Sequence, residues 1–240
     1  GQTAHGFQFD AAQIRGVPTT YYSENSGVGL AFLNHKKRPE PLRVGGLGLG
    51  IGVIAAYGQE NDDFRFYEVN PDVINIAEGG AGYFSFLADS LATVELIPGD
   101  ARVSLEEELL RQGSQSFDLL VLDTFSGGAI PLHLLTKEAF EIYLQHLNHG
   151  GIMAVNVSNN YFDLPQAVFK LADEFNLSAA LIEDRGDRLQ SYDSIWVLLA
   201  REHEALELPV LAFRKSQPPV VPENFRLWTD DFSNLLQIVR

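Results

Sequence analysis

From residue 42 onward, short apolar segments alternate with segments of helical periodicity, and this alternation constrains the fold most strongly. The segments typical of strands are 43–47, 64–69, 93–97, 117–122, 152–157, 178–183 and 195–200. The segments typical of helices are 51–59, one that begins at Pro71, 103–111, 136–147 and 161–175. Strands that alternate with helices predict a mostly parallel sheet covered on both faces. The sequence therefore predicts a doubly wound α/β fold.

The first forty residues follow a different pattern. They are rich in Thr, Tyr, Gly and Asn, and apolar side chains alternate at Val28, Leu30 and Phe32. Such alternation indicates a β-hairpin, so we expect a small N-terminal β element over 1–40 and the main α/β domain over 41–240. A final segment, 232–239, indicates a closing helix.

Composition excludes several classes of protein. The 240 residues include no cysteine, which excludes disulfides, thiolate metal sites and cysteine nucleophiles. Lys and Arg number 17 against 32 Asp and Glu, a net charge of -15. So acidic a chain is expected to bind nucleic acids and anionic membranes poorly and mildly favours cationic ligands. The same charge also increases solubility. The histidines show no spacing typical of metal ligands, so no metal is expected.

A glycine loop follows the first predicted strand of the sheet. Its glycines are Gly45, Gly46, Gly48 and Gly50, and Glu68 ends the next predicted strand 22 residues after Gly46. An acid at about this spacing is placed to accept hydrogen bonds from ribose hydroxyls. The third glycine of a dinucleotide site is missing, because position 51 is Ile and position 53 is Val. The pattern therefore favours a nucleoside ligand without a pyrophosphate, such as S-adenosylmethionine.

Two more acids follow predicted strands. Asp100 comes after 93–97 and can accept from an adenine amino group, or it can instead cap the following helix. Asp123 ends the segment 117–122 and opens an irregular loop, where a carboxylate is a candidate for function, with loop capping as the alternative.

These features belong to a set of motifs that extends over nearly the whole chain. The set comprises the glycine loop, Phe66-Tyr67-Glu68-Val69-Asn70-Pro71, Gly99-Asp100-Ala101-Arg102, Asp123-Thr124-Phe125-Ser126, His5-Gly6-Phe7-Gln8, Tyr22-Ser23-Glu24 and Tyr192. Together they resemble the spermidine synthase (polyamine aminopropyltransferase) family. Residues 129–136 and 228–231 resemble in particular the branch that is fused to membrane segments in bacterial proteins.

The resemblance implies a Rossmann-like class I S-adenosylmethionine-methyltransferase fold, with 41–240 as a nucleoside-binding catalytic domain. It implies transfer of an aminopropyl group from decarboxylated S-adenosylmethionine to an amine. The residue roles that it implies are Asp123 as the catalytic base, Gln8, Gly46, Gly48, Gly50, Glu68, Asp100 and Ala101 as donor-binding residues, and Tyr22 and Tyr192 as acceptor-binding residues.

The chain departs from the family pattern at several positions. Gly48 stands where active members carry an acid that binds the donor's amine, and Ser126 stands where they carry a second acid after the catalytic Asp. Gly128 replaces an Asp that is frequent in the membrane-fused branch, and Asp193 and Ser23 also differ from the usual residues. Loss of charged partners weakens recognition of charged substrate ends.

Two alternatives therefore stay open. One is a methyltransferase that uses intact S-adenosylmethionine, and the other is a non-catalytic nucleoside-sensing domain. We expect a small amine as partner, neither nucleic acid nor membrane contact by this chain, and an ability to form a homodimer. The expected location is the cytoplasm, for the chain by itself or as the soluble domain of a larger membrane protein.

Overall fold

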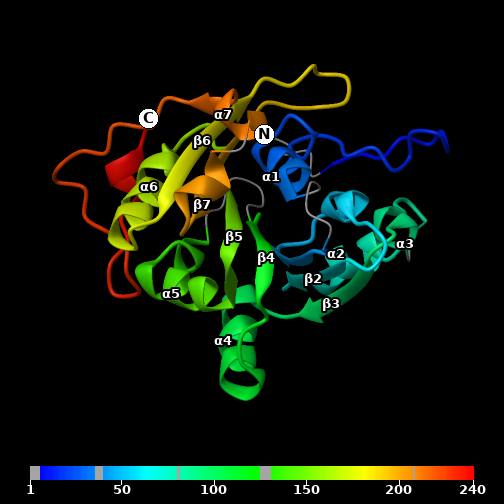
Figure 1. Ribbon diagram of the computed structural model, residues 1–240, viewed down its shortest axis with the longest axis horizontal. Coiled ribbons are helices and arrows are strands. Elements are labelled where there is room, and N and C mark those ends of the chain that lie inside the picture. The colour runs from blue at the N-terminus through cyan, green and yellow to red at the C-terminus, as the bar shows by residue number, and fades with distance from the viewer. Residues whose placement is uncertain (1–5, 36–39, 80–81, 125–130, 208) are drawn as a thin grey trace.

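The computed structural model describes residues 6–35, 40–79, 82–124, 131–207 and 209–240 (Figure 1). Within these residues the strands form one sheet in the order β3-β2-β1-β4-β5-β7-β6-β8. The strands are β1 (Arg43–Leu47), β2 (Asp63–Glu68), β3 (Thr93–Pro98), β4 (Phe117–Leu122), β5 (Leu147–Asn156), β6 (Ser178–Asp184), β7 (Ser194–Ala200) and β8 (Lys215–Ser216). Strands β1 to β5 pair in parallel, whereas β7 pairs antiparallel with both β5 and β6, and β8 is antiparallel to β6.

The order of the strands reverses beside β1. The chain passes from β1 outward to β2 and β3, then crosses back to β4 on the other side of β1. Ligands of open α/β sheets bind outside the carboxyl ends of the strands at such a reversal. The carboxyl ends of β1 and β4 are therefore where the fold places a site.

Helices cover both faces of the sheet (Figure 1). They are α1 (Gly27–His35), η1 (Val53–Tyr57), α2 (Pro71–Ala77), α3 (Phe86–Asp89), α4 (Ala101–Gln112), η2 (Leu132–Leu134), α5 (Lys137–His146), α6 (Leu164–Glu174), η3 (His203–Leu206), α7 (Pro209–Ala212) and η4 (Leu235–Ile238), where η marks a 3-10 helix. Side chains of β4 alternate between the faces: Leu119 and Val121 join a core with α1 and η1, and Leu120 and Leu122 join a core with α4, α5 and α6. This two-sided burial explains why 117–122 is so apolar.

Helices α2, α4 and α5 begin at side-chain caps that the sequence supplies. The side chain of Asn70 accepts from the Asp72 N–H at 2.9 Å and Pro71 occupies the first turn of α2. Asp100 caps α4 by accepting from the Val103 N–H at 3.0 Å, and Thr136 caps α5 in the same way. None of the helices in the described ranges combines the length and the apolar character that crossing a bilayer requires.

The predicted N-terminal β-hairpin is wrong for residues 27–35, which form helix α1. Val28, Leu30, Ala31 and Phe32 are all buried in one core, so this helix has no polar face that would reveal its period in the sequence. Gly27 permits its close approach to the sheet, because an added Cβ would lie 2.3 Å from the Cβ of Trp196. In the described part of the N-terminal segment, the only β pairing is an isolated bridge between Thr20 and Ser191.

The predicted elements of the main domain occur in the predicted order, with local differences. The helix expected over 51–59 is the short 3-10 helix η1, and the closing helix expected over 232–239 is η4. The sheet also gains β8 after the last predicted strand. The division into domains at residue 40 stays a prediction.

Candidate active site

Glu68, Asp100 and Asp123 lie at one edge of the sheet, at the carboxyl ends of β2, β3 and β4. Backbone hydrogen bonds extend the sheet to these positions: the Gly99 N–H donates to the Glu68 carbonyl, and the Asp123 N–H donates to the Leu47 carbonyl, both at 2.9 Å. The strand-end argument from the sequence thus placed all three acids on the correct edge.

The glycine loop runs from β1 along this edge, against the end of β2. An added Cβ at Gly46 would lie 2.4 Å from the Phe66 ring. Gly48 and Gly50 have φ of +91° and +56°, which side chains disfavour. Glu68 holds the loop, because its carboxylate accepts from the Leu49 N–H at 3.0 Å and from the Asn70 N–H at 2.9 Å. In this structure Glu68 therefore stabilises the loop backbone, in addition to the contact with ribose that the sequence predicts.

Asp123 lies between two hydrogen-bond donors. The Tyr22 hydroxyl donates to Oδ2 of Asp123, and Nδ2 of Asn156 donates to Oδ1 at 2.8 Å. Burial, and after it the Asp123 carboxylate, raises the pKa of Tyr22 well above its ordinary value. Tyr22 therefore stays protonated and remains a donor to Asp123.

Aromatic rings extend from Asp123 toward the N-terminal segment. The Tyr22 ring packs edge-on at 6.3 Å from both Tyr21 and Trp196, and Tyr21 packs at 5.7 Å from Tyr192. Phe7 continues the series at 6.3 Å from Tyr192. Burial, Tyr192 and Asp123 together raise the pKa of Tyr21. An aromatic surface that leads to a carboxylate is suited to an alkylammonium group.

Asp100 is part of a polar cluster that joins three segments. Nε2 of His133 lies 2.9 Å from Oδ2 of Asp100, while Oδ1 accepts from the Val103 N–H. Burial alone would raise the pKa of Asp100, but the hydrogen bonds from His133 and from the N–H groups of Val103 and Arg102 lower it below the ordinary value. Asp100 thus caps α4, as the alternative predicted, and its carboxylate stays charged.

Arg102 connects this cluster to the C-terminal segment. Its guanidinium donates to both oxygens of Asp230, at 2.7 and 2.5 Å, and to the His133 carbonyl at 2.9 Å. The Thr136 hydroxyl also donates to Asp230. The motifs 99–102 and 228–231, far apart in the sequence, are therefore in direct contact. Ala101, the first residue of α4, is buried beside them.

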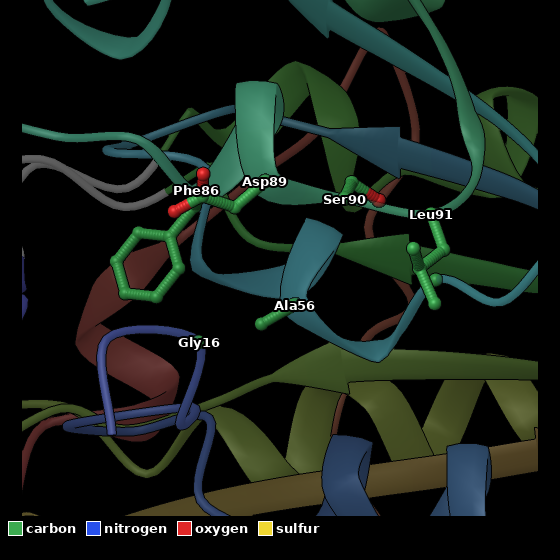
Figure 2. Close-up of a pocket in the computed structure, with 7 residues that line it drawn as sticks. Gly16, Ala56, Phe86, Asp89, Ser90 and Leu91 are labelled. Atoms are coloured by element: carbon green, nitrogen blue, oxygen red, sulfur yellow. The ribbon is translucent and has the colours of Figure 1, made fainter. Parts of the chain in front are cut away.

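Gln8 forms its side-chain hydrogen bonds with Ser85 and Arg15, next to a small hollow. Its side-chain amide donates to the Ser85 hydroxyl and the Arg15 carbonyl, and its oxygen accepts from the Ser85 N–H. Ser85 precedes α3, which borders a hollow of about 180 Å³ shown in Figure 2. The described lining of the hollow includes none of the predicted site residues: it is Gly16, Ala56, Gly58, Phe86, Asp89, Ser90 and Leu91.

Some predicted motif residues cannot be placed. His5 and residues 125–130, with Ser126 and Gly128, lie outside the described residues. Within those residues, no group of three or more His, Cys, Asp or Glu could hold a metal ion. Two residues at the site, Tyr21 and Asn156, were missed from the sequence, and the contact between Arg102 and Asp230 was not predicted. Asn156 was detectable, because it ends β5 just as Glu68 ends β2.

Comparison with known proteins gives one clear relative in sequence. A polyamine aminopropyltransferase from Vibrio vulnificus (strain CMCP6) is 31% identical over 139 residues. The match covers 55% of this chain and 44% of the relative, so it spans less than half of that protein's length. No family model matches the chain.

Solved structures confirm the fold. A spermidine synthase in complex with the transition state analogue AdoDATO is 12% identical, with a TM-score of 0.54, over 84% of this chain and 65% of that one. Human methyltransferase-like protein 13 in complex with SAH is 14% identical, with a TM-score of 0.52, over 82% of this chain and 93% of that one. At these identities the likeness shows the predicted class I methyltransferase-type fold and no more.

Proposed function

We propose that this chain, which is spermidine-synthase-like in sequence and fold, transfers an aminopropyl group from decarboxylated S-adenosylmethionine to a small amine. The observation that carries the proposal is Asp123: a carboxylate at the strand-order reversal, beside the glycine loop and below a series of aromatic rings. The similarity to a polyamine aminopropyltransferase supports the same activity.

In this proposal the donor lies along the carboxyl ends of β1, β2 and β3. Gly46, Gly48 and Gly50 leave the loop backbone open to it, and Glu68 and Gln8 contact its ribose region. Each oxygen of Glu68 has one backbone donor and keeps a second lone pair for a hydroxyl. Asp100 and Ala101 lie at the adenine. The Gln8 amide bonds to Ser85 in this structure, so contact with the ribose would exchange one of these bonds.

The acceptor lies on the aromatic side of Asp123, between Tyr22 and Tyr192. Its nitrogen attacks the methylene carbon next to the sulfonium; the new C–N bond forms as the C–S bond breaks, and the sulfur leaves as a neutral thioether. Alkylamines are mostly protonated at neutral pH, with an ordinary pKa of about 10.4. Asp123 binds the ammonium group and takes the proton that the nitrogen must lose. Most of the remaining acceleration comes from alignment of the two reactants.

Position 48 favours a second candidate, a methyltransferase. Its glycine cannot be replaced by an acid without backbone movement, because an added Cβ would lie 2.2 Å from the Asp123 carbonyl oxygen. The loop therefore offers no carboxylate there for the amine of a decarboxylated donor. The tail of intact S-adenosylmethionine carries its own carboxylate next to the amine. Its binding would therefore depend less on an acid at position 48.

Calorimetry with three ligands tests the proposal. Decarboxylated S-adenosylmethionine, intact S-adenosylmethionine and methylthioadenosine should all bind, and the decarboxylated form should bind better than the intact one. Much tighter binding of the intact form would exclude aminopropyl transfer and support the methyltransferase. Binding without turnover over a broad panel of amines would indicate a nucleoside sensor.

Asp123→Asn then tests the base. We expect turnover to fall at least about a hundredfold while methylthioadenosine affinity is kept, because the amide binds no proton at this pH. Asp118→Asn is the matched control, since Asp118 lies on β4, the strand that ends just before Asp123, and accepts from the Arg43 N–H and from Asn148. Equal rates in both variants would remove Asp123 from the reaction.

A further inference from the structure

We infer that Asn156 is a positioning residue that orients the Asp123 carboxylate and keeps it ionised for the transfer reaction. The inference rests on the proposed function for the role of Asp123, but the hydrogen-bond geometry is independent of it. Asn156 is the last residue of β5, next to β4 in the sheet, and is buried.

The amide of Asn156 can present only its donor to Asp123. Its Oδ1 accepts from the Ser158 N–H at 3.0 Å, which fixes the orientation of the amide. Its Nδ2 therefore faces Oδ1 of Asp123, at 2.8 Å. A rotated amide would lose both bonds, so the donor is held in place by the turn that follows β5.

A single residue of β7, Trp196, supports both Tyr22 and Asn156. Trp196 is paired with Asn156 across the antiparallel strands, and its fully buried ring packs at 6.3 Å from the Tyr22 ring. Its indole N–H donates to the Tyr21 carbonyl at 3.1 Å, which fixes the backbone beside Tyr22. Tyr22 and Asn156 thus reach the two carboxylate oxygens from separate segments that meet at one residue, Trp196.

Hydrogen bonds from neutral donors stabilise the charged form of a carboxylate. They lower the pH at which Asp123 becomes protonated and inactive as a base. They also restrict its rotation, so the carboxylate keeps one orientation relative to the incoming amine. Asn156 acts on the reaction only through Asp123 in this scheme.

Asn156→Leu tests the inference, because leucine has a similar size but no donor. We expect kcat to fall about ten- to hundredfold, the value of a hydrogen bond to a charged group, with donor affinity unchanged. The acid limb of the pH–rate profile should move up by about one unit. Asn156→Asp, which adds a like charge, should move it further.

The chain supplies a matched control at the other end of the same two strands. Asn148 of β5 donates to Asp118 of β4, also at 2.8 Å. Asn148→Leu removes an equivalent hydrogen bond far from the site and should leave kcat and the acid limb unchanged. Circular dichroism and methylthioadenosine affinity verify that each variant folds. An acid limb in Asn156→Leu that equals the wild type or the control overturns the inference.

A second measurement separates this inference from the proposed function. Carboxyl NMR of aspartate-labelled protein, with Asp123 assigned through Asp123→Asn, follows the titration of Asp123 directly. Asn156→Leu should raise its midpoint even if no donor is turned over, in which case only the proposed function fails. An unchanged midpoint in an enzyme that transfers aminopropyl groups overturns only the role of Asn156.

Discussion

Gly48, a residue without a side chain, allows the glycine loop to contact the backbone of Asp123. The carbonyl oxygen of Asp123 occupies the space in which any Cβ at position 48 would lie, 2.2 Å away. The Gly48 N–H meanwhile donates to the Tyr67 carbonyl, and its φ is +91°. The glycine loop and the loop that carries Asp123 can touch only because of this glycine.

Gly48→Ala should therefore damage both stability and activity. The added methyl group must displace the backbone of Asp123 or of the loop, and it also meets an unfavourable φ, at a cost of about 2 kcal/mol or more. Urea unfolding measures the loss. Gly82→Ala is the control, because its φ of +72° is similar but, apart from its chain neighbours, no atom of the described residues lies within 4 Å of its added Cβ. Equal losses in both variants would show that φ alone matters and that the contact with Asp123 does not.

At the scale of elements, the C-terminal segment and the start of α4 form one unit. The Lys137 N–H donates to the Trp228 carbonyl, and the Asp230 N–H donates to Glu138 at the start of α5. The Asp230 carboxylate accepts hydrogen bonds from Arg102, and the same guanidinium donates to the His133 carbonyl. Since His133 contacts Asp100, the tail supports the proposed adenine site through two side chains.

Asp230→Asn should weaken nucleoside binding about fivefold, because it removes the charge that holds Arg102, in a pair that is partly exposed. Global stability should change by less than about 1 kcal/mol. Calorimetry with methylthioadenosine measures the affinity. Asp231→Asn changes the charge by the same amount at the neighbouring exposed residue, so equal affinities in the two variants would contradict the coupling.

At the scale of the whole molecule, the two cores on the faces of the sheet both contain buried tyrosines. Tyr22 and Tyr57 lie in one core and Tyr67 and Tyr143 in the other. Burial, the largest cause in each case, raises the pKa of all four above the ordinary value of 10.0. Above about pH 10 the folded chain therefore keeps phenol protons that the unfolded chain loses.

This difference predicts alkaline unfolding. The tyrosines contribute stability that is fully present below the unfolded pKa of about 10 and is lost as the pH rises above it, by up to about 1.4 kcal/mol per pH unit for each group. Circular dichroism and tyrosinate absorbance, followed together from about pH 9 to about pH 12, check this. Ionisation of all eight tyrosines with the circular dichroism unchanged would contradict it.

Three features could be predicted from the sequence: the α/β class, the order of the predicted elements in the main domain, and the edge of the sheet on which Glu68, Asp100 and Asp123 lie. These follow from local signals: apolar runs mark buried strands, caps such as Asn70 mark helix starts, and the carboxyl ends of neighbouring parallel strands share one edge. Local pattern failed for helix α1, because a helix buried on all sides has no polar face to show its period.

Which side chains contact one another depends on the three-dimensional packing of the chain. Tyr22 and Asn156 bind Asp123 from 101 and 33 residues away, and Arg102 binds Asp230 across 128 residues. No local pattern specifies such partners, because they depend on the packing of Trp196, α1 and the tail against the sheet. The residues that can do chemistry are thus visible in the sequence, whereas the geometry that would let them do it arises from contacts between distant segments.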